Sequence, residues 1–389
     1  MKRIRPPRRA KLTPDIEQLI RLASGLGLSN SRIEDAFWET RLSALVDRLL
    51  KDNDEAALTT ALDQLYGKQD RAYDALADLI EDRSESRQIK GGEVDLLLFA
   101  APLLAWSRFS IPSGAVNAEV LSNARVQLQA HVFAQDARLG LADFLYSPDQ
   151  LPQSYFDTSA LTDKLARAAM HSRNLHIDPL VLPETTNFLS DTRYLIGVVC
   201  VASGSALFRW QEEDGDRAEA LKAWRAQGGE ALRPLLPGCA SELLLPQSYH
   251  AAAREADHLS RPYSLRASVA FLSTSLNIAP AELRCVVAPY HDLRLEEFRI
   301  GFMAKGSGEL VHGAVWPLLD GEDEGSESGA VIETVLREIG VGEVIVLDHR
   351  LPLEYCDDCG APLYPNPEGE SVHAEMPEEQ ATAAPRHLH

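Results

Sequence analysis

The residues of this chain that are best suited to chemistry are two cysteines near the C-terminus, Cys356 and Cys359. Two residues separate them, which is the spacing by which a zinc knuckle holds one ion between two thiolates. Gly360 follows the pair and lets backbone amides approach the sulfur atoms. His349 precedes the pair and His373 follows it, so the chain offers a tetrahedral set of two nitrogens and two sulfurs. The pattern predicts a structural zinc knuckle over residues 356–373.

The string CDDCGAPLYPN, which begins at Cys356, also resembles one half of a zinc ribbon. A ribbon has a second cysteine pair, and this sequence has none. Three other cysteines lie in apolar segments and are typical of buried structural thiols, although the fold could bring one of them to the site: Cys200, Cys239 and Cys285. Two further interpretations of the pair stay open, namely idle thiols in a turn and a redox dithiol. The acidic neighbours Asp357 and Asp358 disfavour the redox interpretation, because negative charge raises the pKa of a thiol.

Charge is unevenly distributed along the 389 residues. The formal net charge is −20, yet six of the first eleven residues are basic and none is acidic. An acidic body repels phosphates, so DNA binding and broad nucleic-acid binding are not expected. The segment 1–12 is expected to be a flexible basic arm, which either is solvated or contacts RNA, an anionic surface or the acidic body itself.

The remaining composition is typical of a water-soluble protein in a reducing compartment. The sequence contains no 18-residue apolar window and no apolar signal segment at its N-terminus. Five cysteines without a disulfide-rich spacing indicate a cytoplasmic location. No phosphate-binding loop, dinucleotide fingerprint, metalloprotease motif or nucleophile elbow is present, so the motifs do not decide whether the protein is an enzyme.

A repeated pentapeptide predicts the architecture. Leu-Pro-Gln-Ser-Tyr occurs at 151–155 and 245–249, and the variant Leu-Pro-Leu-Glu-Tyr occurs at 351–355. Each copy follows an apolar run that ends in proline, and the spacing from that proline to the pentapeptide is equal in the second and third copies. Self-similarity of this kind indicates duplicated structural units. We therefore predict three related α+β units, arranged around a pseudo-threefold axis or in tandem: 91–177, 178–281 and 282–355.

Local signals predict the elements within and before these units. Glycine favours hairpin turns at Gly204-Ser205 and near Gly306. Helices are expected at 157–171, 250–260, 217–233 and 329–339. The segment 13–90 is expected to be a helical bundle, with helices from Thr13, at 31–51, at 54–66 and at 69–84, and with Phe37 and Trp38 in its core. The segment 374–389 is rich in Pro, Glu and Ala, which predicts a disordered acidic tail.

Several stretches together are similar to a family of bacterial proteins that is known as a domain of unknown function. They are SRIEDAFWETRL (31–42), AWSRFSIPSG (105–114), DQLPQSY (149–155), DTRYLIG (191–197) and LPLEYCDDCGAPLYPNPEGE (351–370). The resemblance spans nearly the whole chain. It implies a cytoplasmic protein of bacteria and supplies no activity, cofactor or catalytic residue.

Three functional hypotheses follow. The first is a regulatory or interaction protein with a structural zinc knuckle. The second is an enzyme with a site in a cleft between the α+β units, where pockets commonly form. The third is an RNA-associated factor that uses the basic arm.

Overall fold

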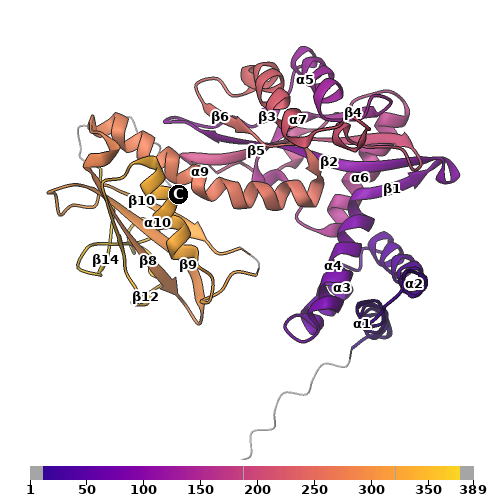
Figure 1. Ribbon diagram of the computed structural model, residues 1–389, viewed down its shortest axis with the longest axis horizontal. Helices are drawn as coiled ribbons and strands as arrows, with labels where there is room; N and C mark the ends of the chain where they lie inside the picture. Colours follow the sequence, from indigo (N-terminus) through magenta and orange to yellow (C-terminus); the bar gives the residue numbers. More distant parts are fainter. Residues whose placement is uncertain (1–11, 187, 320, 377–389) are drawn as a thin grey trace, which may run out of the picture.

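The structure is a computed structural model, and it describes residues 12–376 with the exception of 187 and 320. Helices and sheets are both abundant, and the sheets are antiparallel or mixed, so the predicted α+β class is confirmed. Figure 1 shows a helical bundle, a larger layered body and a smaller C-terminal sheet, which a long helix connects to the body. The predicted arm over 1–12 and the predicted tail over 374–389 lie almost entirely outside the described residues.

The N-terminal bundle has four helices: α1 (Pro14–Gly27), α2 (Arg32–Lys51), α3 (Glu55–Leu65) and α4 (Asp70–Glu85). Thr13 caps α1 as expected, because its side chain accepts a hydrogen bond from the Ile16 amide. Ser31 caps α2, because its side chain accepts a hydrogen bond from the Glu34 amide. The apolar faces of all four helices meet in one buried cluster.

The two neighbouring aromatic residues of α2 differ in their environment. Trp38 packs against the bundle core and lies over Gly25 of α1. Phe37 is 47% exposed, and the guanidinium of Arg41 covers its ring at 3.5 Å from the ring centroid. The expectation that Phe37 is a core residue is therefore wrong, because α2 points it outward.

The body is built on a seven-stranded sheet whose centre is the antiparallel pair β2 (Val94–Trp106) and β5 (Ser190–Ala202). Strand β4 (Arg138–Tyr146) lies beside β5, and β3 (Gly114–Ala115) lies beside β4. Three short strands lie beside β2: β1 (Ser86–Ile89), β6 (Ala240–Leu243) and β7 (Gln247–Ser248).

Helices cover both faces of this sheet (Figure 1). One face carries α5 (Ala118–His131), α7 (Arg217–Ala223) and α8 (Gly229–Leu232), and the other carries α6 (Tyr155–Met170) and α9 (Tyr249–Leu276). A π-helical turn, η5 (Trp224–Gly228), joins α7 to α8. Alternate residues of β2 enter two different cores, with Phe99 and Leu103 in one and Leu98 and Leu104 in the other. A strand that is buried on both faces has to be apolar, which explains the unbroken apolar run of β2 from Leu96 to Trp106.

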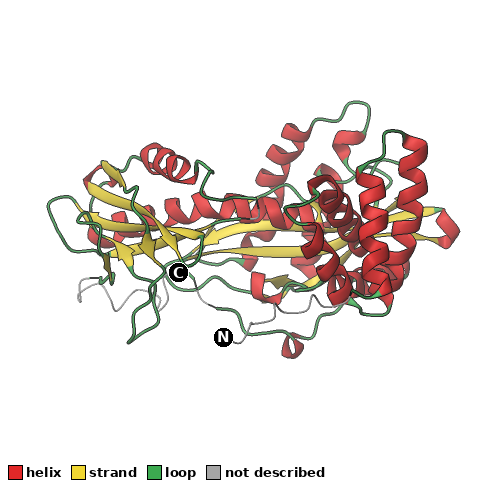
Figure 2. Cartoon of the chain, turned by 90° about the horizontal axis from the view of Figure 1, so that it is seen from below, coloured by secondary structure: helices red, strands yellow, loops and turns green. Residues whose placement is uncertain are grey.

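The second sheet consists of β8 (Leu283–His291), β9 (Leu295–Ala304), β10 (His312–Pro317), β11 (Glu343–Val346) and β12 (Leu351–Pro352). Helix α10 (Ser328–Ile339) and the second half of α9 cover one face. The C-terminal segment, which contains β13 (Tyr364–Pro365) and β14 (Ser371–Val372), crosses the other face. Figure 2 shows the two sheets following one another along the molecule.

Short 3-10 helices form several of the connections: η1 (Lys90–Gly92), η2 (Pro148–Gln150), η3 (Pro179–Val181), η4 (Arg209–Gln211), η6 (Arg233–Leu235) and η7 (Pro280–Glu282). Helix α9 was expected only over residues 250–260. It instead continues through Pro262 to Leu276, and its two halves pack on different sheets.

The three copies of the pentapeptide occupy two kinds of position. In the first two copies the tyrosine is the first residue of a helix, Tyr155 in α6 and Tyr249 in α9. In the third copy the first two residues form β12, and no helix follows Tyr355 as far as Met376, the last described residue. The strands of 91–177 and 178–281 share one sheet. The division into three units stays a prediction, in which the third copy has a different local structure.

The two hairpin expectations have opposite outcomes. Strands β9 and β10 pair on either side of the turn near Gly306, which confirms that hairpin. The prediction of a hairpin at Gly204 is wrong, because β5 ends at Ala202 and the chain continues into η4. Phe208 is held instead by an isolated bridge to Phe133, and their rings are 5.5 Å apart in the core.

The bundle is joined to the body through the first turns of α6 and α9. Glu55 of α3 accepts hydrogen bonds from the amides of Tyr155 and Phe156 at 3.2 and 3.1 Å. Glu85 of α4 accepts one from the amide of His250 at 2.9 Å. Both carboxylates therefore lie at the positive end of a helix dipole, where negative charge is stabilised.

The contact of Glu85 with α9 is buried. The side chain of Glu85 lies beside Ser84, whose hydroxyl is 2.8 Å from Nε2 of His250, and the rings of Tyr155 and Tyr249 flank that imidazole. Burial raises the pKa of Glu85 to about 7, although the His250 amide acts in the opposite direction. Burial lowers the pKa of His250 to about 4, so its ring is neutral near pH 7.

We predict that Glu85→Gln flattens the pH dependence of stability. The pKa of Glu85 is higher in the folded state, about 7, than the reference value of 4.5, so the folded protein binds the proton more tightly. The stabilisation of the folded state by this protonated carboxyl is therefore fully present below about pH 4.5 and is lost as the pH rises through about 7. Glutamine still accepts from the His250 amide and does not ionise. In urea unfolding at about pH 8, the free energy of unfolding of the variant is expected to exceed that of the wild type by about 1–3 kcal/mol.

The exposed Glu213→Gln variant changes the formal charge equally and serves as the control. It is expected to follow the wild-type profile. A Glu85→Gln profile that is parallel to wild type between about pH 5 and about pH 8 would contradict the assignment.

Candidate metal centre

The C-terminal segment approaches the second sheet closely at two glycines. A Cβ atom on Gly313 would lie 2.3 Å from the ring of Tyr364, and one on Gly301 would lie 2.4 Å from the carbonyl oxygen of Pro365. Tyr364 is consequently only 1% exposed. Residues with side chains at these two positions of β9 and β10 would hold the segment away from the sheet. The sheet is therefore shaped to receive it.

Arg299 of β9 holds both ends of the loop that carries the cysteines. It is fully buried, and its Nη1 donates to the carbonyl oxygens of Glu354 at 2.6 Å and Leu363 at 2.8 Å. Its Nε donates to Glu297 at 2.6 Å. The guanidinium also lies over the rings of Tyr290 and Tyr355. These contacts fix the position of the loop relative to the sheet.

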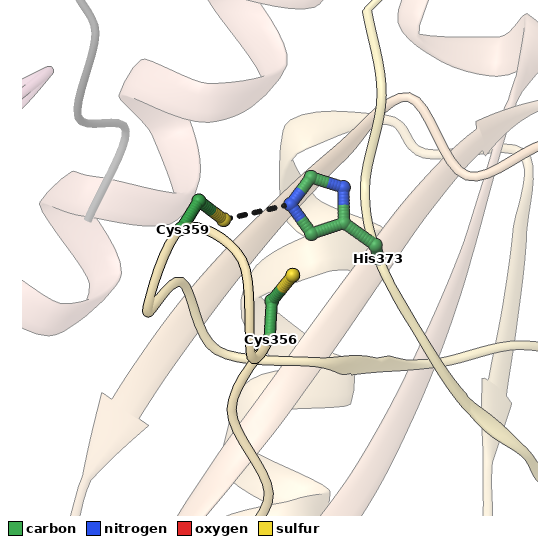
Figure 3. Close-up of side chains that lie close together, drawn as sticks. All are labelled: Cys356, Cys359 and His373. Atoms are coloured by element: carbon green, nitrogen blue, oxygen red, sulfur yellow. Dashed lines mark hydrogen bonds between the residues drawn. The ribbon is translucent and has the colours of Figure 1, made fainter.

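The loop itself is a tight knuckle. The amide of Cys356 donates to the carbonyl of Ala361 at 2.7 Å, and the amide of Gly360 donates to the carbonyl of Cys356 at 2.8 Å. Gly360 has a φ of +72°, a left-handed conformation that disfavours other residues. The turn thus folds the chain back so that both sulfurs lie on one side, as Figure 3 shows.

Backbone amides surround the first sulfur. The amides of Cys359 and Asp358 donate to Cys356 Sγ and, as the main causes, hold the pKa of this thiol below its usual value. The charge of Asp358 acts in the opposite direction as a smaller effect. The charge of Asp358 thus raises the pKa of this thiol as expected, but the amide dipoles outweigh it and the net shift is downward.

Three predicted ligands converge at this knuckle. The ligand atoms of Cys356, Cys359 and His373 all lie within 4.8 Å of one another. Cys359 Sγ and His373 Nε2 are 3.3 Å apart, and all three side chains face a common point (Figure 3). Two ligands of a tetrahedral zinc ion are about 3.4–3.8 Å apart, given bond lengths of about 2.0–2.3 Å. The group therefore fits a zinc ion with small side-chain adjustments.

The third ligand, His373, directly follows the last described strand, β14. The amide of Glu375 donates to the carbonyl of Leu310 at 2.9 Å, which holds this part of the chain beside the sheet. The carboxylate of Glu375 lies 3.7 Å from Nδ1 of His373. A carboxylate beside the non-coordinating nitrogen orients a histidine ligand and makes it more basic. Glu375 was not among the residues predicted from the sequence, although its position two residues after a candidate ligand was a usable signal.

The structure does not bring His349 into this group. Its Nε2 lies 3.3 Å from the carbonyl oxygen of Gly369, and its ring packs against that glycine. The three remaining cysteines are also elsewhere: Cys200 in β5, Cys239 near Ser110 and Cys285 in β8. Burial raises the pKa of the thiols of Cys200 and Cys285. Such thiols are structural, as the sequence suggested.

Comparison with known proteins identifies the family. Residues 4–387 match the family model described as "Protein of unknown function (DUF2863)". The chain belongs to this family. No curated protein and no solved structure matches the chain. No helix in the described part of the chain is long and apolar enough to cross a membrane.

We predict that Arg299→Met destabilises the C-terminal segment. The substitution leaves Glu297 without its partner and the carbonyls of Glu354 and Leu363 without a donor. The free energy of unfolding is expected to fall by about 2–4 kcal/mol, as for a broken buried pair. Limited proteolysis should cut within 353–374 sooner than in wild type.

The matched control is Arg294→Met, since Arg294 forms an exposed pair with Glu296 in the same strand region. This variant is expected to change stability by less than about 0.5 kcal/mol. Equal effects of the two substitutions would show that Arg299 does not anchor the knuckle.

Proposed function

We propose that this protein binds one zinc ion through Cys356, Cys359 and His373. The observation that carries the proposal is the convergence of two sulfurs and one nitrogen within 4.8 Å. Thiolate and imidazole are ligands that zinc prefers, and amide hydrogen bonds to sulfur favour the thiolate that binds metal. Three protein ligands leave one coordination position, which water or an external ligand would fill.

The ion would have a structural role, and the protein would be a regulatory or interaction protein of the bacterial cytoplasm. Cys359 is exposed and the knuckle lies at the surface of the second sheet, whereas catalytic metals commonly lie in an enclosed cleft. Zinc would join the loop at 356–361 to His373, which directly follows β14. All five cysteines are free, which agrees with a reducing compartment.

We predict that the protein purified without chelators carries about one zinc per chain, measured by elemental analysis. Cys356→Ser combined with Cys359→Ser should abolish zinc binding and accelerate proteolysis of 353–374, because metal binding is coupled to folding of this segment. The first sheet should stay folded, since its two cores are formed by other residues.

Two histidine variants form a matched pair. His373→Ala should lose the zinc, and His349→Ala should retain it, because His373 Nε2 lies 3.3 Å from Cys359 Sγ whereas His349 Nε2 lies 3.3 Å from the carbonyl oxygen of Gly369. Loss of zinc from His349→Ala would instead support the four-ligand set that the sequence suggested. A metal-free protein whose double serine variant has the wild-type proteolysis pattern would disprove the zinc site. A reversible disulfide in that protein would support the redox alternative.

A further inference from the structure

A groove of about 590 Å³ runs along α6, away from the cysteine site. The first pentapeptide forms one wall through residues 151–153, and the segment 175–183 forms the other. The amide of Leu175 donates to the carbonyl of Leu141, and the amide of Asp143 donates to the carbonyl of Leu175, which joins this segment to β4. The groove lies where the sequence predicted the boundary between the first two units, and the zinc proposal does not involve it.

The floor of the groove is apolar. Its five apolar side chains are packed against the body core on one side and border the groove on the other: Leu151, Leu161, Leu175, Ile177 and Leu182. Val181 lies at the rim and is 74% exposed. A concave apolar surface with a few polar groups at its edge is typical of a small-molecule site.

The polar groups at the edge are mainly carboxylates. Asp149, Asp157 and Asp178 line the groove, and each uses one oxygen to accept a hydrogen bond from a nearby backbone amide or hydroxyl group. None of the three forms an ion pair with any described residue. Each therefore keeps one oxygen for a ligand.

The groove contains little positive charge to balance these acids. Lys164 is a cation at the rim, and His176 is bound to Asp143, which is 2.8 Å from its Nδ1. The lining therefore has an excess of negative charge, and the whole chain carries a net charge of −20. Such a field attracts cations and repels anions.

We propose that this groove binds a small organic amine. The hydrocarbon part of the ligand lies on the leucine-rich floor, where its removal from water drives binding. The ammonium group faces the free oxygens of Asp149, Asp157 and Asp178 at the edge. Neither half of this arrangement is sufficient alone, since an apolar floor does not distinguish charge and exposed carboxylates hold a lone cation weakly.

Three probes with the same chain length separate these contributions: hexylamine, hexanol and hexanoate. Binding to the full chain is measured by ligand-observed NMR or calorimetry at low salt. Hexylamine is expected to bind about tenfold tighter than hexanoate, with hexanol between them, and added salt should reduce the difference. Equal affinities for hexylamine and hexanoate, or no binding of any probe, would overturn the proposal.

Charge variants locate the site. The triple variant Asp149→Asn, Asp157→Asn and Asp178→Asn keeps every observed acceptor and should lower hexylamine affinity to that of hexanol, which should not change. The control combines Glu213→Gln, Asp214→Asn and Asp292→Asn, which removes the same charge from exposed positions outside the groove. Equal loss in the control would show that the effect is not local to the groove.

A further variant is expected to bind hexylamine more tightly than the wild type, which a variant that merely misfolds could not do. Lys164 is exposed and forms no ion pair in the described part of the chain. Lys164→Gln should therefore tighten hexylamine and weaken hexanoate by about twofold to fivefold each. Binding of a basic peptide with no binding of hexylamine would exclude a small amine as the ligand.

Discussion

The antiparallel pairing of β2 with β5 is the interaction on which the rest of the body depends. The two strands pair along 13 residues each, and helices bury both faces of the pair. The outer strands are interlocked, because β4 pairs with β5 and β6 pairs with β2. Each of the first two predicted units therefore completes the sheet of the other, and neither has a complete sheet alone.

The two helices that begin at the repeated pentapeptide connect this sheet to the bundle and to the second sheet. Helices α6 and α9 pack on the same face of the sheet, and their first turns receive carboxylates from the bundle. The bundle is thus attached by capping the helices of another domain, at the place where helix dipoles favour negative charge. Helix α9 then continues past the first sheet and forms part of the second core, so one helix positions both sheets.

The C-terminal segment depends on a different constraint, which is close packing on a sheet face that carries glycine. Gly301 and Gly313 leave room for the chain, and Arg299 supplies the donors for the carbonyls on either side of the cysteine loop. A buried arginine without these carbonyls would be unfavourable. The sheet therefore holds the cysteine loop beside His373, so that the three candidate ligands lie close together.

The sequence by itself determined those features that rest on local chemistry: the helices of the bundle, the hairpin near Gly306 and the spacing of Cys356 and Cys359. Helix periodicity, turn glycines and ligand spacing are properties of neighbouring residues, so one sequence is sufficient to predict them. Only the tertiary structure decided which distant residues meet. It placed His373 at the sulfurs and His349 against Gly369, and it paired strands of two predicted units in one sheet. The physical reason is that strand pairing and side-chain convergence join residues far apart in the chain, and local pattern contains no information about those distances.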